Sequence, residues 1–97
     1  MKNNNQIAII GLGYVGLPLA VEFAKKYMVV GFDINLQRTA ELNNGEDNTL
    51  EVPSLNLKKV LLDQDGNLSY NKSGLVISSN AEDISSANTY IITVPTP

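Results

Sequence analysis

Cysteine, histidine and tryptophan are all absent from this chain of 97 residues. Without cysteine there is no disulfide and no thiolate nucleophile, and without histidine there is no imidazole base. A zinc site built from the usual ligands is excluded for the same reason. The usual thiol nucleophile and the usual imidazole acid–base group are therefore missing from these positions.

Long apolar runs and a strong charge bias are missing too. The net charge is −3, with 43% hydrophobic and 18% charged residues, which is an ordinary composition for a small domain. The chain has no run of 18 apolar residues and no basic patch, so neither membrane insertion nor nucleic-acid binding is supported. Residues 1–6 are polar and lack the apolar core of a signal peptide, which makes a cytoplasmic location the expectation.

A glycine motif is the most informative feature that is present. Gln6 to Ile10 is typical of a short buried strand, and Gly11, Gly13 and Gly16 follow it. This G-x-G-x-x-G spacing is typical of a dinucleotide-binding turn: the first glycine allows a sharp turn, the second admits a pyrophosphate, and the third lets the next helix pack closely. The N–H groups that open that helix then point at the phosphates. The simpler alternative is a glycine turn that only joins a strand to a helix.

An acid stands where such a motif predicts one. Residues 28–32 are typical of a second buried strand, and Asp33 follows it, 17 residues after Gly16. Its carboxylate would accept hydrogen bonds from the adenosine ribose and repel a 2′-phosphate, which favours NAD over NADP. Arg38 lies one helical turn further on, and the pattern leaves open whether it contacts the ligand or is a surface helix residue. A solvated strand-end acid is the alternative for Asp33.

Helical patterns separate the expected strands. Asn35 is expected to cap a helix over residues 36–43, and Ser54 a second helix that runs through Leu62. Residues 65–67 predict a turn, with a small hairpin as one possibility. Ser79 is expected to open a capping box for a short helix to about Ser86. The first helix is expected to bury one apolar stripe, formed by Leu19, Phe23, Ala24 and Tyr27.

Apolar, β-branched runs over residues 75–78 and 89–94 complete a set of four strands. Strands that alternate with helices imply parallel pairing and right-handed crossovers. The expected fold is α/β, a Rossmann-type parallel sheet with strand order 3-2-1-4 and flanking helices, amounting to about the first half of that fold. Thr96 would then face the same dinucleotide as the glycine turn, unless Pro95 and Pro97 simply end the strand.

Three motifs in this order resemble one known family. They are Gly-Leu-Gly-Tyr-Val-Gly-Leu-Pro-Leu-Ala at 11–20, Gly-Phe-Asp-Ile-Asn at 31–35 with Arg38, and Ile-Ile-Thr-Val-Pro-Thr-Pro at 91–97. Together they are similar to the N-terminal domain of the UDP-glucose/GDP-mannose dehydrogenase family. The resemblance implies NAD contacts from Gly11, Leu12, Gly13, Tyr14, Val15, Gly16, Asp33, Arg38, Val94, Pro95 and Thr96; on residue pattern alone, Tyr14 and Val15 are as readily read as first-turn packing.

The resemblance also implies a reaction. Family members oxidise the C6 hydroxyl of a nucleotide sugar to a carboxylate in two NAD-dependent steps, through an aldehyde and a covalent thiohemiester on a cysteine. Residues 32–35, 44–47 and 49–51 look most like the branch that oxidises UDP-N-acetylhexosamines for capsular or O-antigen polysaccharide.

The expected organisation follows from the same resemblance. Residues 1–97 would form an incomplete N-terminal NAD-binding domain, inactive alone, with the catalytic cysteine, its lysine and acid partners, and the sugar-binding and dimerising regions beyond position 97. A homo-oligomer is expected, and the open edge of the fourth strand predicts self-association or low stability. Another two-domain NAD dehydrogenase, acting on a hydroxy acid or hydroxyacyl substrate, and a non-catalytic nucleotide-binding module are the alternatives.

Overall fold

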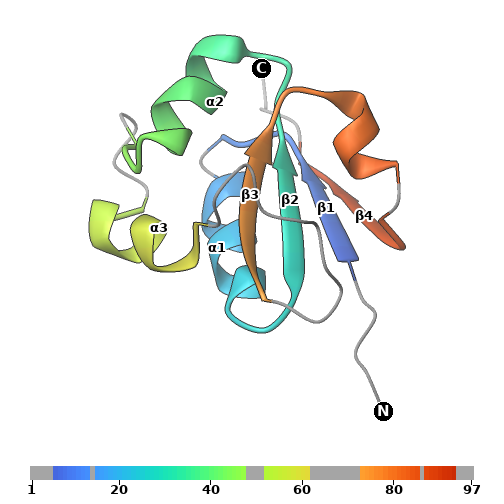
Figure 1. The fold of residues 1–97 in the computed structure, drawn as a ribbon, viewed down its shortest axis with the longest axis horizontal. Coiled ribbons are helices and arrows are strands. Elements are labelled where there is room, and N and C mark those ends of the chain that lie inside the picture. Colours follow the sequence, from blue (N-terminus) through green and yellow to red (C-terminus); the bar gives the residue numbers. More distant parts are fainter. Residues whose placement is uncertain (1–5, 14, 48–51, 62–72, 86, 94–97) are drawn as a thin grey trace.

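A parallel sheet of four strands, in the order β3-β2-β1-β4, forms the centre of the computed structural model (Figure 1). The structure describes residues 6–13, 15–47, 52–61, 73–85 and 87–93. The strand order and the parallel pairing confirm the predicted Rossmann-type fold class. The elements in chain order are β1 (Gln6–Ile10), α1 (Gly16–Ala24), β2 (Met28–Phe32), α2 (Leu36–Asn43), α3 (Ser54–Val60), β3 (Gly74–Ser78), the 3-10 helix η1 (Ala81–Ile84) and β4 (Thr89–Ile92).

The three strands β1, β2 and β3 are apolar except at Gln6 and Ser78, and nearly all their residues are buried because the sheet is covered on both faces. Ile7 of β1 pairs with Val29 of β2, which pairs with Leu75 of β3, and all three side chains are buried. The neighbouring positions, Ala8 and Val30, point to the other face and are buried as well. Continuous apolar runs are the expected pattern for parallel strands with elements on both sides.

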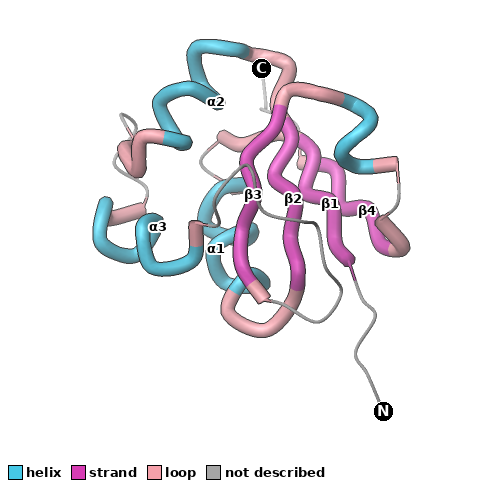
Figure 2. The backbone as a smooth tube through the Cα atoms, viewed as in Figure 1, coloured by secondary structure: helices cyan, strands magenta, loops and turns pink. Residues whose placement is uncertain are grey.

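Helices and connections supply that cover. Figure 1 shows α1 behind the sheet and the β3–β4 connection with η1 in front of it. Figure 2 shows a helical segment between each pair of successive strands. This is the arrangement that right-handed crossovers produce when the strand order reverses between β3 and β4. Among the described residues, the helices are too short and too polar for any of them to cross a membrane.

The main core lies between α1 and the sheet. The predicted stripe on α1 was partly wrong: Ala24 is buried, but Leu19, Phe23 and Tyr27 pack only at the margin of the core. Because α1 begins at Gly16, the positions that face the sheet at helical spacing are Leu17, Ala20, Val21 and Ala24. The core cluster consists of Ile7, Ile9, Leu12, Leu17, Ala20, Val21, Ala24, Val29, Leu42, Val52, Leu57, Leu75 and Ile77.

Of the caps predicted for α2 and α3, the first is confirmed and the second is wrong. Asn35 caps α2 as predicted, since its Oδ1 accepts from the backbone N–H of Gln37 at 3.0 Å. Ser54 does not cap α3; it is the first helical residue, and Pro53 is the N-cap. Pro53 is held extended, with φ of −59° and ψ of 143°, and its carbonyl accepts the first helical hydrogen bonds. The helix ends at Val60, earlier than predicted.

The capping box predicted at Ser79 was also wrong. The cap is Asn80, whose Oδ1 accepts from Glu82 N at 3.0 Å, and the element is a 3-10 helix over Ala81–Ile84. Ser79 is unavailable as a cap because its hydroxyl is hydrogen-bonded to that of Thr39 at 2.8 Å. Strand β4 ends at Ile92 and η1 at Ile84, both earlier than predicted. Val94, Ser86 and the turn predicted at residues 65–67 lie outside the described residues.

Candidate functional site

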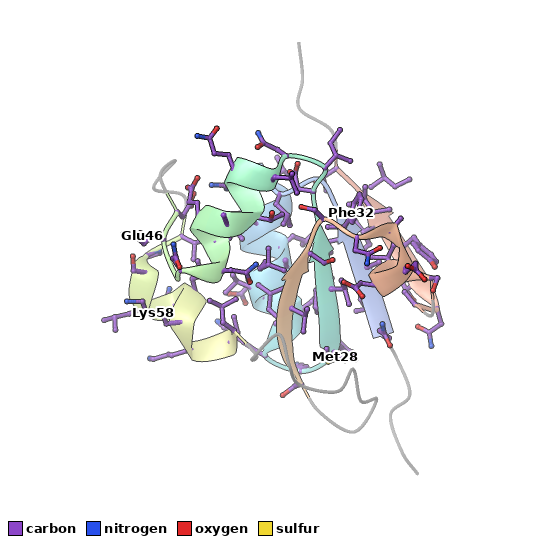
Figure 3. The ribbon with its side chains drawn as sticks, turned by 45° about the horizontal axis from the view of Figure 1, so that its top comes forward. Met28, Phe32, Glu46 and Lys58 are labelled. Carbon is purple, nitrogen blue, oxygen red and sulfur yellow. The ribbon has the colours of Figure 1, made fainter. Side chains whose placement is uncertain are left out.

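The carboxyl ends of the four strands meet at one edge of the sheet. Hydrogen bonds join them there: Gly11 N donates to Phe32 O at 2.8 Å, Asp33 N to Ser78 O at 3.1 Å, and Thr93 N to Ile10 O at 2.8 Å. Figure 3 shows Met28 and Phe32 at opposite ends of β2, and the glycine turn lies at the Phe32 end. Ligands of open α/β sheets bind outside this edge, where the strand order reverses.

Two of the three motif glycines are required by the packing of the turn itself. Gly11 has a φ of +98°, and a Cβ there would lie 1.9 Å from the carbonyl oxygen of Thr93. A Cβ on Gly16 would lie 1.8 Å from Gly11 O and 2.5 Å from Thr93 Oγ1. Thr93 Oγ1 also donates to Gly11 O at 2.7 Å. The turn is therefore pressed against the end of β4 with no room for a side chain at either position.

Gly13 is different, because the protein itself does not require it. Gly13 is exposed, and apart from its two chain neighbours no heavy atom of the described residues lies within 4 Å of the position that a Cβ would take there. Its φ also lies outside the left-handed region. The open space in front of Gly13 is where a ligand can approach the backbone.

The start of α1 is also open. Val15 is the N-cap residue, it makes no side-chain capping bond, and the first turn of α1 carries no acidic residue. In that turn Leu17 N donates to Gly13 O at 3.0 Å and Leu19 N to Val15 O at 3.4 Å, and Pro18 has no N–H. The attraction for an anion there comes from the positive end of the helix dipole and the N–H of Gly16. Val15 itself is 57% exposed, so its side chain is not part of the core packing.

A cavity of about 450 Å³ adjoins the turn. Ile34, 83% exposed, adds an apolar surface beside the carboxylate of Asp33. A mainly apolar cleft with a few fixed polar groups is the usual form of a small-molecule site. Its lining residues are Ile10, Gly11, Phe32, Asp33, Ile34, Asn35 and Thr93.

Asp33 is fixed in this cavity by two backbone amides. Its Oδ2 accepts from Leu12 N at 3.0 Å, and its Oδ1 accepts from Asn35 N at 2.9 Å. Because each carboxylate oxygen offers two lone pairs, both oxygens keep the capacity to accept a second donor. The alternative of a freely solvated strand-end acid does not describe this half-buried, doubly held carboxylate.

Arg38 is not a surface helix residue. Its side chain is only 11% exposed, and its Nε donates to the carbonyl oxygen of Leu12 at 2.8 Å. Its Nη1 pairs with Glu41 at 2.9 Å and with Asp47 at 2.8 Å. Its Nη2 is buried and has no hydrogen-bond partner within the part of the chain that the structure describes. The guanidinium thus lies directly behind the glycine turn.

Of the residues predicted to contact the cofactor, Asp33 and Arg38 are both hydrogen-bonded to the backbone of Leu12. Four others lie around the same turn: Gly11, Gly13, Val15 and Gly16. Sequence reasoning missed Thr93 as a turn-holding residue, although it is the first polar position after the β4 run. It also missed the buried Asp47. The other predicted contacts lie outside the described residues: Tyr14, Val94, Pro95 and Thr96.

A second cavity, of about 460 Å³, lies away from this edge. It adjoins the end of α1 and the start of β3, and contains two exposed lysines but no residue of the glycine turn and no strand carboxyl end. The cavity beside Asp33, although similar in volume, is the one that the fold and the motif both identify. The second cavity is lined by Ala24, Lys25, Asn56, Lys59, Val60, Ser73 and Gly74.

Residues 5–97 match the UDP-glucose/GDP-mannose dehydrogenase family, NAD binding domain. The chain is 50% identical over 92 residues to UDP-N-acetyl-D-glucosamine 6-dehydrogenase of Pseudomonas aeruginosa, a match that covers 95% of this chain and 19% of that relative. It is 48% identical over 94 residues to Protein CapL of Staphylococcus aureus, covering 97% of this chain and 19% of CapL. The chain therefore spans about a fifth of the length of the curated relatives that it matches.

A solved structure agrees with these relatives. The structure of UDP-D-ManNAc dehydrogenase from Pyrococcus horikoshii superposes with a TM-score of 0.74 at 36% identity, over 95% of this chain and 20% of that one. The resemblance that the three motifs indicated is confirmed at the level of the family and its NAD binding domain.

Proposed function

This chain belongs to the UDP-glucose/GDP-mannose dehydrogenase family, within its NAD-binding domain, and we propose that it holds NAD against the glycine turn, with the diphosphate at the start of α1 and the adenosine ribose at Asp33. The observation that carries this proposal is the contrast between the glycines. At Gly11 and Gly16 a Cβ would collide with Thr93 or with the turn itself, whereas Gly13 faces open space in which a ligand can approach the backbone.

The groups around the turn fit a dinucleotide. The start of α1 offers a diphosphate the N–H of Gly16 and the positive end of the helix dipole, which stabilises an anion by about 0.3–1 kcal/mol, more when partly buried. Asp33 is anchored by two amides and can still accept from a ribose diol. The exposed face of Ile34 beside it would be covered by the adenine ring. Within the part of the chain that the structure describes, Nη2 of Arg38 has no hydrogen-bond partner, and a buried donor left unsatisfied costs about 1–3 kcal/mol.

Within a longer protein, we propose that the domain serves a nucleotide-sugar 6-dehydrogenase whose substrate is a UDP-N-acetylhexosamine, by analogy with the substrates that the relatives' names give. NAD, when bound, accepts hydride from the sugar. This chain's residues would bind and orient the cofactor: the turn fixes the diphosphate and Asp33 fixes the ribose. This proposal has further parts. Residues 1–97 would form an incomplete NAD-binding domain, and a separate part of the protein would carry catalysis and bind the sugar. The protein would act in surface polysaccharide synthesis, in the cytoplasm and as a homo-oligomer.

Calorimetric titration tests the proposed site. We expect NAD and ADP-ribose to bind with similar affinity, because the residues around the turn address the adenosine and the diphosphate. Nicotinamide mononucleotide, which lacks both the adenosine and the full diphosphate linkage, should bind far more weakly. Equal binding of the mononucleotide, or no binding of ADP-ribose, would contradict the assignment of the turn and Asp33 to the adenosine half.

The activity is tested on the full-length protein. NADH absorbance during incubation with UDP-N-acetyl-D-glucosamine or UDP-N-acetyl-D-mannosamine should report two NAD reduced per sugar, since an alcohol loses two hydride equivalents on its way to a carboxylate. Reduction with a 2-hydroxy acid instead would support the other dehydrogenase class. NAD binding without oxidation of any alcohol would support a non-catalytic module.

A further inference from the structure

A buried cluster of charges lies behind the glycine turn. Arg38 pairs with Glu41 and Asp47, and the side chains of the three residues are 11%, 17% and 0% exposed. The second oxygen of Asp47 accepts from the backbone N–H of Val52 at 3.0 Å, which ties the α2–α3 connection to the same cluster. Buried charges are tolerated only where they are paired and hydrogen-bonded, so these contacts fix the positions of the three side chains.

The cluster reaches the turn through a single residue. Arg38 Nε donates to Leu12 O, and Leu12 N donates to Asp33 Oδ2. The backbone of Leu12, which is fully buried, is therefore held on one side by the arginine and on the other by the acid that faces the cavity. Asp47 does not line that cavity, yet it is two contacts away from Leu12, whose backbone N–H holds the cavity residue Asp33.

The charges of the cluster bear on which dinucleotide the site accepts. An arginine beside the ribose can bind the 2′-phosphate of NADP when its guanidinium is free. Here the guanidinium is turned toward Leu12 O and is compensated by two carboxylates, with Asp33 adding a third negative charge beside the turn. A 2′-phosphate entering this site meets uncompensated negative charge and no available cation among the described residues around it.

We propose that Asp47 is a positioning residue that sets the preference for NAD over NADP. It holds the guanidinium of Arg38 on the glycine turn, and it cancels the charge with which that guanidinium would attract a 2′-phosphate. This inference rests on the proposed function, because it assumes that the adenosine ribose lies at Asp33. Asp47 acts through Arg38 and Leu12 and does not touch the cofactor.

The test is Asp47→Asn, which keeps the shape of the side chain and removes its charge. NAD and NADP are titrated separately into the wild type and the variant by calorimetry, with urea unfolding measured in parallel. We expect NAD to bind more weakly, because Arg38 is no longer held by Asp47. We also expect the ratio of the NADP to the NAD dissociation constant to fall about tenfold, because one of the two negative charges that compensate the guanidinium is removed. A purely structural role would weaken both ligands by the same factor and leave the ratio unchanged.

Glu46→Gln is the matched control. It removes the same charge one position earlier from an exposed side chain, labelled in Figure 3, for which no hydrogen bond or ion pair to Arg38 occurs within the described residues. Its ratio should equal that of the wild type. If Asp47→Asn does not fold, Glu41→Gln removes the other carboxylate from Arg38 and should lower the ratio in the same direction.

The outcomes separate this inference from the proposed function. If the wild type binds NAD, and neither Asp47→Asn nor Glu41→Gln changes the ratio of the NADP to the NAD dissociation constant, the role of Asp47 is refuted and the proposed site is not. A ratio that falls equally in Glu46→Gln also overturns it, because the effect would then be one of net charge alone. Wild type that binds neither dinucleotide refutes the proposed function, and the inference with it.

Discussion

Replacing Gly13 by alanine should separate ligand binding from stability. A Cβ at Gly13 has open space, and its φ is outside the left-handed region, so alanine fits without strain. Reduced freedom of the unfolded chain should then stabilise the fold by about 0.4–1 kcal/mol. The same methyl group would stand in the path of the diphosphate, and the loss of one charge-assisted hydrogen bond of about 1.5–3 kcal/mol corresponds to about 10- to 100-fold weaker NAD binding.

Gly16→Ala is the matched contrast, three positions along the same turn. Its Cβ would lie 1.8 Å from Gly11 O, which is a backbone atom that cannot move aside without displacing β1 or α1. Overpacking of this kind costs about 1–3 kcal/mol or more. We therefore expect Gly16→Ala to lose stability, and any loss of NAD affinity to accompany that destabilisation.

Urea unfolding and NAD calorimetry on the two variants and the wild type measure both effects. The reasoning is refuted if Gly13→Ala binds NAD as tightly as the wild type, because the open space at Gly13 would then serve no diphosphate. It is also refuted if Gly13→Ala unfolds as readily as Gly16→Ala, because the turn would then need Gly13 for its own packing.

Three further changes address other parts of the molecule. Asp33→Asn keeps one acceptor oxygen and loses the charge, so NAD affinity should fall by about tenfold or more, which calorimetry measures; unchanged affinity would remove Asp33 from the ribose site. Thr93→Val deletes the hydrogen bond to Gly11 O and should cost about 1 kcal/mol in urea unfolding, whereas a neutral result would mean that the turn holds its shape without it. Ile92→Lys adds a charge to the edge strand β4, where Ile92 is 67% exposed, and sedimentation should show less self-association than in the wild type; a wild type that is already monomeric at high concentration would contradict the idea.

The elements that could be predicted from sequence are those with a local signal. The apolar runs of β1 and β2 and the cap at Asn35 are encoded within a few residues, and the strand order follows from alternation and crossover handedness. Asp33 could be placed because strand length and helix length together fix its distance from the glycines. The caps of α3 and η1 could not, because Ser54 and Ser79 are outcompeted by their neighbours, Pro53 and Asn80.

Within the site, the missing information was long-range. Nothing local marks Asp47 as buried, since its position depends on Arg38, nine residues earlier, and on the carbonyl of Leu12 beyond it. Arg38 could be linked to the ribose by its spacing from Asp33, but whether its guanidinium was free or compensated depended on partners that sequence spacing does not reveal. Charge compensation of this kind is a tertiary property.

The bond between Thr93 and Gly11 joins residues 82 positions apart. A chain made from its N-terminus exposes the glycine segment early, but the carbonyl and hydroxyl of Thr93 that shape it are made only after β4, more than 80 residues later. Long-range parallel pairing is also the slow part of folding, because the entropy of closing the loop is lost before the new contacts stabilise the chain. The turn therefore acquires its final form only when β4 docks, and a nascent chain should gain affinity for its nucleotide in one step that follows the pairing of β4 with β1.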